Sequence, residues 1–133
     1  MSAPNIAAQG AVRFTTPIND IKVVSAVIAN GASISGAIDT RLRQLVGLQM
    51  PAAWSTASLT FDGSFDGTTY VPIHHGAGAY TINAAAGAAA SLGVSLDPEA
   101  FAPWPYVKIR SGVIGTYVNQ GAERTIQVLT RAG

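Results

Sequence analysis

The fold class is indicated most clearly by residues 57–67, which read ASLTFDGSFDG. Apolar Ala57, Leu59 and Phe61 alternate here with polar residues, and the side chains of a β-strand point to opposite faces with the same two-residue period. Two Asp-Gly pairs follow, and this dipeptide favours the positive φ angles of hairpin turns. The stretch therefore predicts a strand that enters a hairpin.

The same alternation returns in the runs on either side. Upstream, one strand is expected to turn a single apolar face inward, made of Leu42, Val46, Leu48 and Met50. Downstream, two further strands are expected to bury one pair of β-branched residues each: Val107 with Ile109, and Ile126 with Val128. We therefore predict an all-β chain, a two-sheet antiparallel β-sandwich or jelly roll, with a closed barrel as the alternative.

Length and composition predict one domain with few charges. The chain has 133 residues, which is enough for a single hydrophobic core. Charged residues make up 11% of it, with a net charge of +1. No basic stripe is visible, so nucleic acid and membrane surfaces are not expected partners. Residues 1–17 have no strict period and predict an extended N-terminal arm, and residues 18–133 predict the single β-sandwich domain.

Residues that carry chemistry are sparse. The chain has no cysteine, which excludes thiol catalysis and zinc-thiolate sites. The adjacent His74 and His75 are not accompanied by a Gly-x-Ser-x-Gly nucleophile motif. The oxygen-rich residues 62–67 are explained better by turn formation than by a calcium loop. We therefore predict no catalytic residues, no cofactor and no metal, in a chain that is not an enzyme.

The arm and one aromatic loop hold the candidate partner contacts. Ile6, Val12 and Phe14 are large apolar residues that a freely solvated tail has little reason to include. Trp104 lies between two prolines, which hold its loop extended, so it is expected at the surface or against a neighbour. Trp54 and the cluster of Phe101, Trp104 and Tyr106 are also a candidate stacking platform for a sugar ring, with core or interface packing as the alternative.

Two segments resemble a pattern found in small structural proteins of tailed bacteriophages and prophages. The first runs from residue 48 to residue 70 and includes 48–54 (LQMPAAW) and 57–61 (ASLTF). The second runs from residue 96 to residue 124 and includes 106–112 (YVKIRSG) and 118–120 (VNQ), and the resemblance as a whole covers roughly residues 33–129. Such proteins are usually decoration, cement or head-fibre components. The segment with Ser64, Asp66 and Gly67, together with the later YVKIR, is also similar to galactose-binding-like jelly rolls of the discoidin type.

The resemblance implies a non-enzymatic virion protein that binds and stabilises the outer head surface as a capsid decoration or cement protein. It implies two partners, the major capsid protein and further copies of the chain, with a trimer favoured. It also implies a location at the phage head surface after synthesis in the host cytoplasm. Two alternatives stay open. One is a carbohydrate-binding adhesion module of a head or tail fibre, and the other is a head-tail connector or tail component.

Overall fold

The chain folds into strands joined by loops, and the computed structural model describes residues 20–84 and 88–132. The longer strands are β1 (Ile21–Ile28), β3 (Arg43–Gln49), β4 (Leu59–Ser64), β9 (Tyr106–Val113) and β11 (Arg124–Ala132). The shorter elements are β2 (Ile38–Asp39), β5 (Val71–Pro72), β6 (His74–His75), β7 (Gly78–Ala79), β8 (Gly93–Ser95), the 3-10 turn η2 (Pro98–Ala100) and β10 (Thr116–Tyr117). No helix in this described part is long and apolar enough to cross a membrane.

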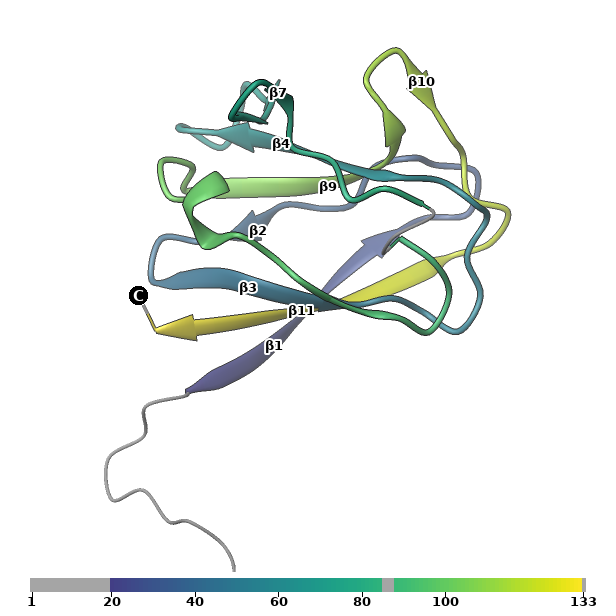
Figure 1. The fold of residues 1–133 in the computed structure, drawn as a ribbon, viewed down its shortest axis with the longest axis horizontal. Helices are drawn as coiled ribbons and strands as arrows, with labels where there is room; N and C mark the ends of the chain where they lie inside the picture. Colours follow the sequence, from purple (N-terminus) through teal and green to yellow (C-terminus); the bar gives the residue numbers. More distant parts are fainter. Residues whose placement is uncertain (1–19, 85–87, 133) are drawn as a thin grey trace, which may run out of the picture.

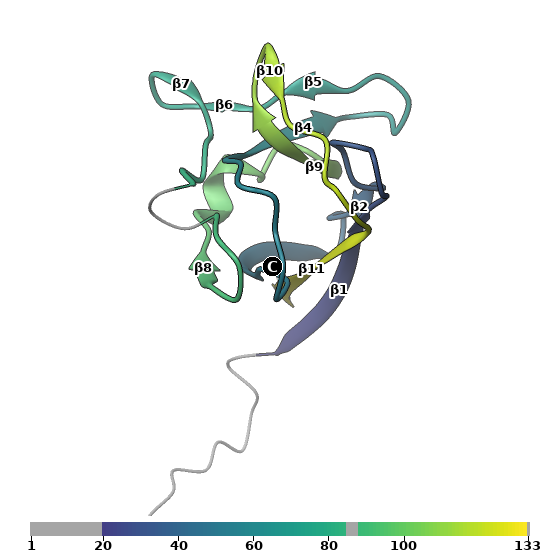
Figure 2. The same cartoon turned by 90° about the vertical axis from the view of Figure 1, so that its right-hand side faces the viewer.

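Two antiparallel sheets form the two layers of the molecule (Figure 1). One sheet has the strand order β1-β11-β3-β8. The other has the order β10-β9-β4-β5, and β2 also pairs with β9. The β6–β7 hairpin is a small separate sheet that lies next to the second layer (Figure 2). The all-β sandwich predicted from the sequence is therefore confirmed.

Most connections between strands pass from one sheet to the other. β1 leads to β2, β2 leads to β3, and β3 leads to β4, each time across the sandwich. The hairpins β4–β5 and β9–β10 stay within one sheet. This strand order is compatible with the jelly roll that the sequence suggested, which is also a double-sheet fold. The finer assignment as a jelly roll stays a prediction.

The hydrophobic core lies between the two sheets and follows the expected alternation. In β9, Val107 and Ile109 are fully buried, and in β11 Ile126 and Val128 are as well. Phe61 of β4 is the largest fully buried side chain. Side chains that alternate along paired strands place one apolar row of each sheet inward, so these predicted core positions are confirmed.

Strand β3 departs from the expected alternation at its start. Its pairing with β11 shifts register at one point, which leaves Val46 without a partner of its own. One extra residue in a strand changes the side to which its neighbours point. Leu45 takes the inward position instead of Val46, and Leu42 lies in the preceding loop with 87% of its surface exposed. The predicted inward face is therefore confirmed for Leu48 and Met50 and wrong for Leu42 and Val46.

The two Asp-Gly pairs have different roles. Asp66 and Gly67 lie in the turn between β4 and β5, where Asp66 Oδ1 accepts two backbone N–H groups at 2.8 and 3.0 Å. Gly67 has a φ of +80°, a value that glycine adopts without strain. Asp62 and Gly63 lie inside β4 and are buried there. The predicted hairpin is confirmed. Only the second Asp-Gly pair, Asp66 and Gly67, lies in its turn.

Candidate functional site

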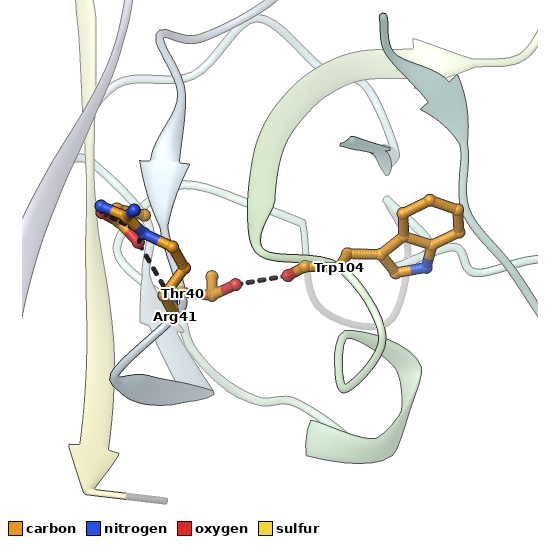
Figure 3. Close-up of polar contacts among 4 residues, drawn as sticks. Thr40, Arg41 and Trp104 are labelled. Carbon is orange, nitrogen blue, oxygen red and sulfur yellow. Dashed lines mark hydrogen bonds and ion pairs between the residues drawn. The ribbon is translucent and has the colours of Figure 1, made fainter. Parts of the chain in front are cut away.

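Trp104 is the one predicted contact residue within the described part of the chain, since Ile6, Val12 and Phe14 lie outside it. It is half-buried and packs against the core cluster. Its carbonyl oxygen accepts a hydrogen bond from Thr40 Oγ1, and the indole ring points away from Thr40 (Figure 3). The surface position expected for Trp104 therefore applies only to part of the ring.

The Trp104 ring lies directly over Gly63 of β4. A Cβ atom added to Gly63 would be 2.6 Å from Cδ2 of the ring, closer than real contacts allow. Glycine at this position thus lets the indole reach the backbone of the sheet, as expected where a ring and a strand approach closely. The loop that holds Trp104 is anchored on the core by this contact.

We expect Gly63→Ala to displace Trp104 and to lower the thermal unfolding midpoint, because the new methyl group collides with a rigid ring. Trp104 emission, read in a Trp54→Phe background, should shift to longer wavelength as the ring becomes more exposed. Gly36→Ala is the matched control, since nothing lies within 4 Å of a Cβ atom added there. Equal effects of the two substitutions would contradict the ring contact.

Asp39 and Arg41 form an exposed ion pair on either side of Thr40. Arg41 Nη2 lies 2.6 Å from Asp39 Oδ2, and Arg41 Nε donates to Asp39 Oδ1 at 2.9 Å. Hydrogen bonding from the Arg41 side chain lowers the pKa of Asp39 to about 2. The guanidinium also lies over the Tyr106 ring, 5.4 Å from its centroid. The charges of this pair are therefore held in place by each other and by the ring.

The Asp39 carboxyl should titrate with a midpoint near pH 2 in the folded chain, as read by NMR. A lowered pKa means that the ion pair is fully formed above the ordinary value of 3.8 and is lost as the pH falls through about 2. Arg41→Ala should return the midpoint toward 3.8, because the largest cause of the shift is removed. A midpoint near 3.8 in the unsubstituted chain would contradict the pairing.

The outer side of the β4–β9 sheet carries charges that stack on tyrosines. Lys108 Nζ lies 4.3 Å from the centroid of the Tyr70 ring, and the Arg110 guanidinium lies 4.0 Å from that of Tyr117. Arg110 also forms a 2.7 Å ion pair with Asp62 of β4. We call this side, the outward side chains of β4 and β9 with their tyrosines, the charged face.

The outer side of the other sheet is nearly free of charge. Cross-strand register places outward side chains side by side, because directly paired residues of an antiparallel sheet share a face. We call these side chains the apolar face: Ile21, Val23, Ser25, Val27, Gln44, Gly47, Gln49, Thr125, Gln127, Leu129 and Arg131. Its charged member is Arg131, at the end of the sheet, whereas Val23 near the edge is 58% exposed. The two outer sides of the sandwich therefore differ in chemistry.

Strand β1 is the outermost strand of the sheet that carries the apolar face, and its first half is uncovered. Residues 21–25 are all exposed, although their side chains alternate in direction, so both sides of the strand are open. Away from β11, the described residues pair with β1 only through a bridge between Ile28 and Ser35, at its end. Figure 1 shows the start of β1 reaching beyond the rest of the sheet. We call the unpaired side of residues 21–27 the open edge.

A pocket of about 310 Å³ lies beside η2 and the start of β3. It is lined by Thr40, Arg41, Leu42, Arg43, Gln44, Leu45, Pro98, Phe101 and Ala102. Both arginines already have partners: Arg41 binds Asp39, and Arg43 donates to Thr130 Oγ1 at 2.8 Å. Because both arginine side chains of the pocket are already bound to other residues of the chain, the pocket is a weak candidate for an anion site.

His75 serves a structural contact. Its Nε2 atom lies 2.9 Å from Asp97 Oδ2, and its ring meets that of Tyr80 edge-on. Asp97 also caps η2, because its Oδ1 atom accepts the N–H of Glu99 at 3.0 Å. These contacts brace the β6–β7 hairpin against η2. Within the described residues, no three His, Cys, Asp or Glu side chains come together as a metal site would require.

The rings considered for a sugar platform are dispersed. Phe101 is buried and packs edge-on against Phe61, with 5.0 Å between the ring centroids. Trp54 is half-buried, and its Nε1–H donates to the Ala57 carbonyl at 3.1 Å. Trp104 packs on β4, as described above. Each ring contributes to the core, so these three do not form a shared stacking surface.

Comparison of the chain with known protein families finds no match, and a search of curated proteins finds none either. The apolar face and the open edge are also the features that sequence reasoning missed. A signal was present, because residues 21–28 read IKVVSAVI and are apolar at both odd and even positions. A strand that is buried on one side needs apolar residues only at every second position. The apolar residues at the remaining positions of this strand therefore indicate that its other side is covered as well.

Proposed function

We propose that the chain is a non-enzymatic structural protein of a tailed-phage virion, and that it decorates and stabilises the outer surface of the head. The observation that carries this proposal is the contrast between the apolar face and the charged face. A protein that attaches permanently to a larger surface needs one side that is easily covered and one that stays in water. The apolar face is the side that a partner covers easily. On the charged face the outward residues of β4 are already buried and the charges of β9 are paired or stacked within the fold, so that side needs no partner.

The chemistry of the apolar face favours burial against another protein. Valine, isoleucine and leucine gain from leaving water, and the serine, threonine and glutamine among them cost little to bury when they find hydrogen-bond partners. The centres of protein interfaces are likewise depleted of charged residues. The partners that fit this face are the major capsid protein and further copies of the chain, for which we keep a trimer as the favoured assembly.

The resemblance of two sequence segments to phage head proteins adds a second line of support. One of these segments contains β4, and the other contains β9, so the resemblance covers the two long central strands of the charged-face sheet. A carbohydrate-binding role has less support, because Trp54 and Trp104 pack separately on the core. The faces of Tyr70 and Tyr117 are each covered on one side by a cation.

The proposal is tested by placing a charge on the apolar face and measuring attachment to undecorated phage heads by co-sedimentation. Val23→Lys should weaken attachment at least tenfold, because a cation would be desolvated at the contact. The matched control is Leu42→Lys, which makes the same kind of change at an exposed loop residue away from this face. Circular dichroism spectra should show that both variants fold.

Three outcomes would count against the proposal. The first is full-strength attachment of Val23→Lys, which would remove the apolar face from the contact. The second is the failure of the unsubstituted chain to sediment with heads at any concentration tested. Equal weakening by Leu42→Lys would also count against the apolar face, because it would indicate a general effect of added charge.

A further inference from the structure

We propose that residues 11–16 of one copy of the chain add a strand to the open edge of β1 in a second copy. This inference is independent of the virion role, because it concerns association between copies of the chain alone. It accounts for the open edge, which no described segment occupies along residues 21–27.

The open edge has the properties of an acceptor for another strand. Its backbone N–H and C=O groups that point away from β11 lack strand partners within the described residues, and such groups are a template for strand addition. On its outer side Ile21, Val23 and Val27 present an exposed aliphatic row. Long exposed apolar edges of this kind are normally covered in stable proteins. An added strand would satisfy the backbone groups and cover the row together.

Residues 11–16 read AVRFTT and match this acceptor in length and pattern. Val12 and Phe14 are two positions apart, so in an extended segment their side chains share one side. Valine, phenylalanine and threonine are also residues that favour strands. We assign Val12 and Phe14 to the outer side, where they would lie beside the aliphatic row and enlarge the apolar face. The opposite side of the edge carries Lys22 and Val24, and it suits these two residues less well because the Lys22 ammonium would lie beside them.

The start of β1 favours a second copy over the same copy as the source of this strand. Arg43 binds the Asp20 carboxylate at 3.3 Å and also donates to the Asp20 carbonyl oxygen. Arg43 belongs to β3, which lies on the other side of β11 from β1. The chain therefore enters β1 tied toward β11 and β3, on the side away from the open edge. A tight turn back onto its own edge would have to give up these bonds.

The length of chain between the added strand and β1 limits how far apart the two copies can lie. Four residue steps separate residues 16 and 20, and an extended segment of this length spans about 13 Å. That distance exceeds the spacing of about 5 Å between neighbouring strands, so the segment can reach the edge of a copy that packs directly against its own. Reciprocal exchange of the same segment would close a symmetric assembly, since each copy supplies one strand and one edge.

The test uses the absence of cysteine in the natural chain, so that every thiol is an introduced one. One preparation carries Phe14→Cys, and the other carries a single cysteine on the outer side of the edge, at Ile21, Val23 or Val27 in turn. The two are mixed, allowed to exchange and oxidised. We expect a disulfide-linked heterodimer with at least one of these partners, formed at least tenfold more than with the control Lys22→Cys, which points to the opposite side.

Three outcomes would overturn the inference. Equal cross-linking to Lys22→Cys would mean random collision of the thiols. Absence of heterodimer with all three outer-side variants would mean that the segment does not reach this edge. A double variant, Phe14→Cys with Val23→Cys, that closes an intramolecular disulfide in a monomer would place the strand on its own copy.

A second measurement does not depend on cysteine geometry. Deletion of residues 1–17 should leave the circular dichroism spectrum of the sandwich unchanged and shift the chain to a monomer in light scattering. The matched control is Arg13→Ala, which keeps both apolar residues of the segment and should keep the assembly. An unaltered oligomeric state after the deletion would overturn the inference, whatever happens on phage particles.

Discussion

Replacing Phe61 by alanine should lower the free energy of unfolding by about 4 kcal/mol, as expected for removal of a buried aromatic side chain. The Phe61 ring is completely buried in β4, with its centroid 5.0 Å from that of Phe101 and 5.7 Å from that of Tyr80. β4 is paired on both sides, by β9 and β5, so its backbone has little freedom to close the cavity. Urea unfolding followed by circular dichroism gives the value.

Phe65→Ala is the matched control for this prediction. Phe65 lies in the turn that follows the same strand, with 74% of its surface exposed. The same change of side chain there should alter the free energy of unfolding by less than about 0.5 kcal/mol, because almost no apolar area returns to water. Similar losses from the two substitutions would contradict the placement of Phe61 between the sheets.

A second large effect is expected from Asp62→Ala, which should cost about 3 kcal/mol of stability because it leaves a buried cation without its counter-charge. The Asp62 and Arg110 side chains keep only 9% and 17% of their surface exposed. Arg110 Nε has no hydrogen-bond partner among the described residues, so the loss of Asp62 leaves the guanidinium mainly with the Tyr117 ring. Chemical denaturation measures the change.

A double-mutant cycle separates this pair from general damage to the strand. Adding Arg110→Ala to Asp62→Ala should recover part of the loss, so that the double variant is more stable than the sum of the single effects predicts. The exposed Asp39–Arg41 pair supplies a contrast, because Asp39→Ala should have little effect on stability in ordinary salt. Strictly additive losses at Asp62 and Arg110 would mean that the two side chains do not stabilise each other.

The strands with one strict apolar face could be predicted from the sequence. Phe61, Val107 and Ile126 each belong to a row of buried apolar residues spaced two positions apart in their strand. This two-residue period is enough to identify the inward face of a strand. The turn at Asp66 and Gly67 could be predicted because its chemistry is local. The sandwich followed from several such strands in one chain.

The register of β3 and the placement of Trp104 could not be predicted, because each depends on residues distant in the sequence. The bulge at Val46 is a property of the pairing with β11, about 80 residues further along. Trp104 packs on the core because Gly63 has no side chain to occupy the position of its ring. The sequence does not show this contact, because it depends on β4 lying beside the loop. The two prolines around Trp104 indicate an extended backbone, but they do not indicate that its ring packs against Gly63.

The candidate interaction surface was only partly visible in the sequence. Apolar residues at both odd and even positions of β1 indicate that both of its sides are covered, but not whether the cover is the chain's own core or something else. Their exposure becomes clear once β11 is placed on one side of β1 and, within the described chain, only Ser35 bridges to its other side, at Ile28. Strand order, a non-local property, thus determines which apolar strand is buried and which stays exposed in the described chain.

The proposal that the chain decorates a phage head is tested most directly by electron cryomicroscopy of purified tailed-phage particles that contain it. We predict density for the β-sandwich on the outside of the head, with the β1–β11–β3–β8 sheet turned toward the shell or a neighbouring copy and the charged face turned toward solvent. Density for the chain confined to the tail or the connector would contradict this account, as would a sandwich on the head whose apolar face is open to water.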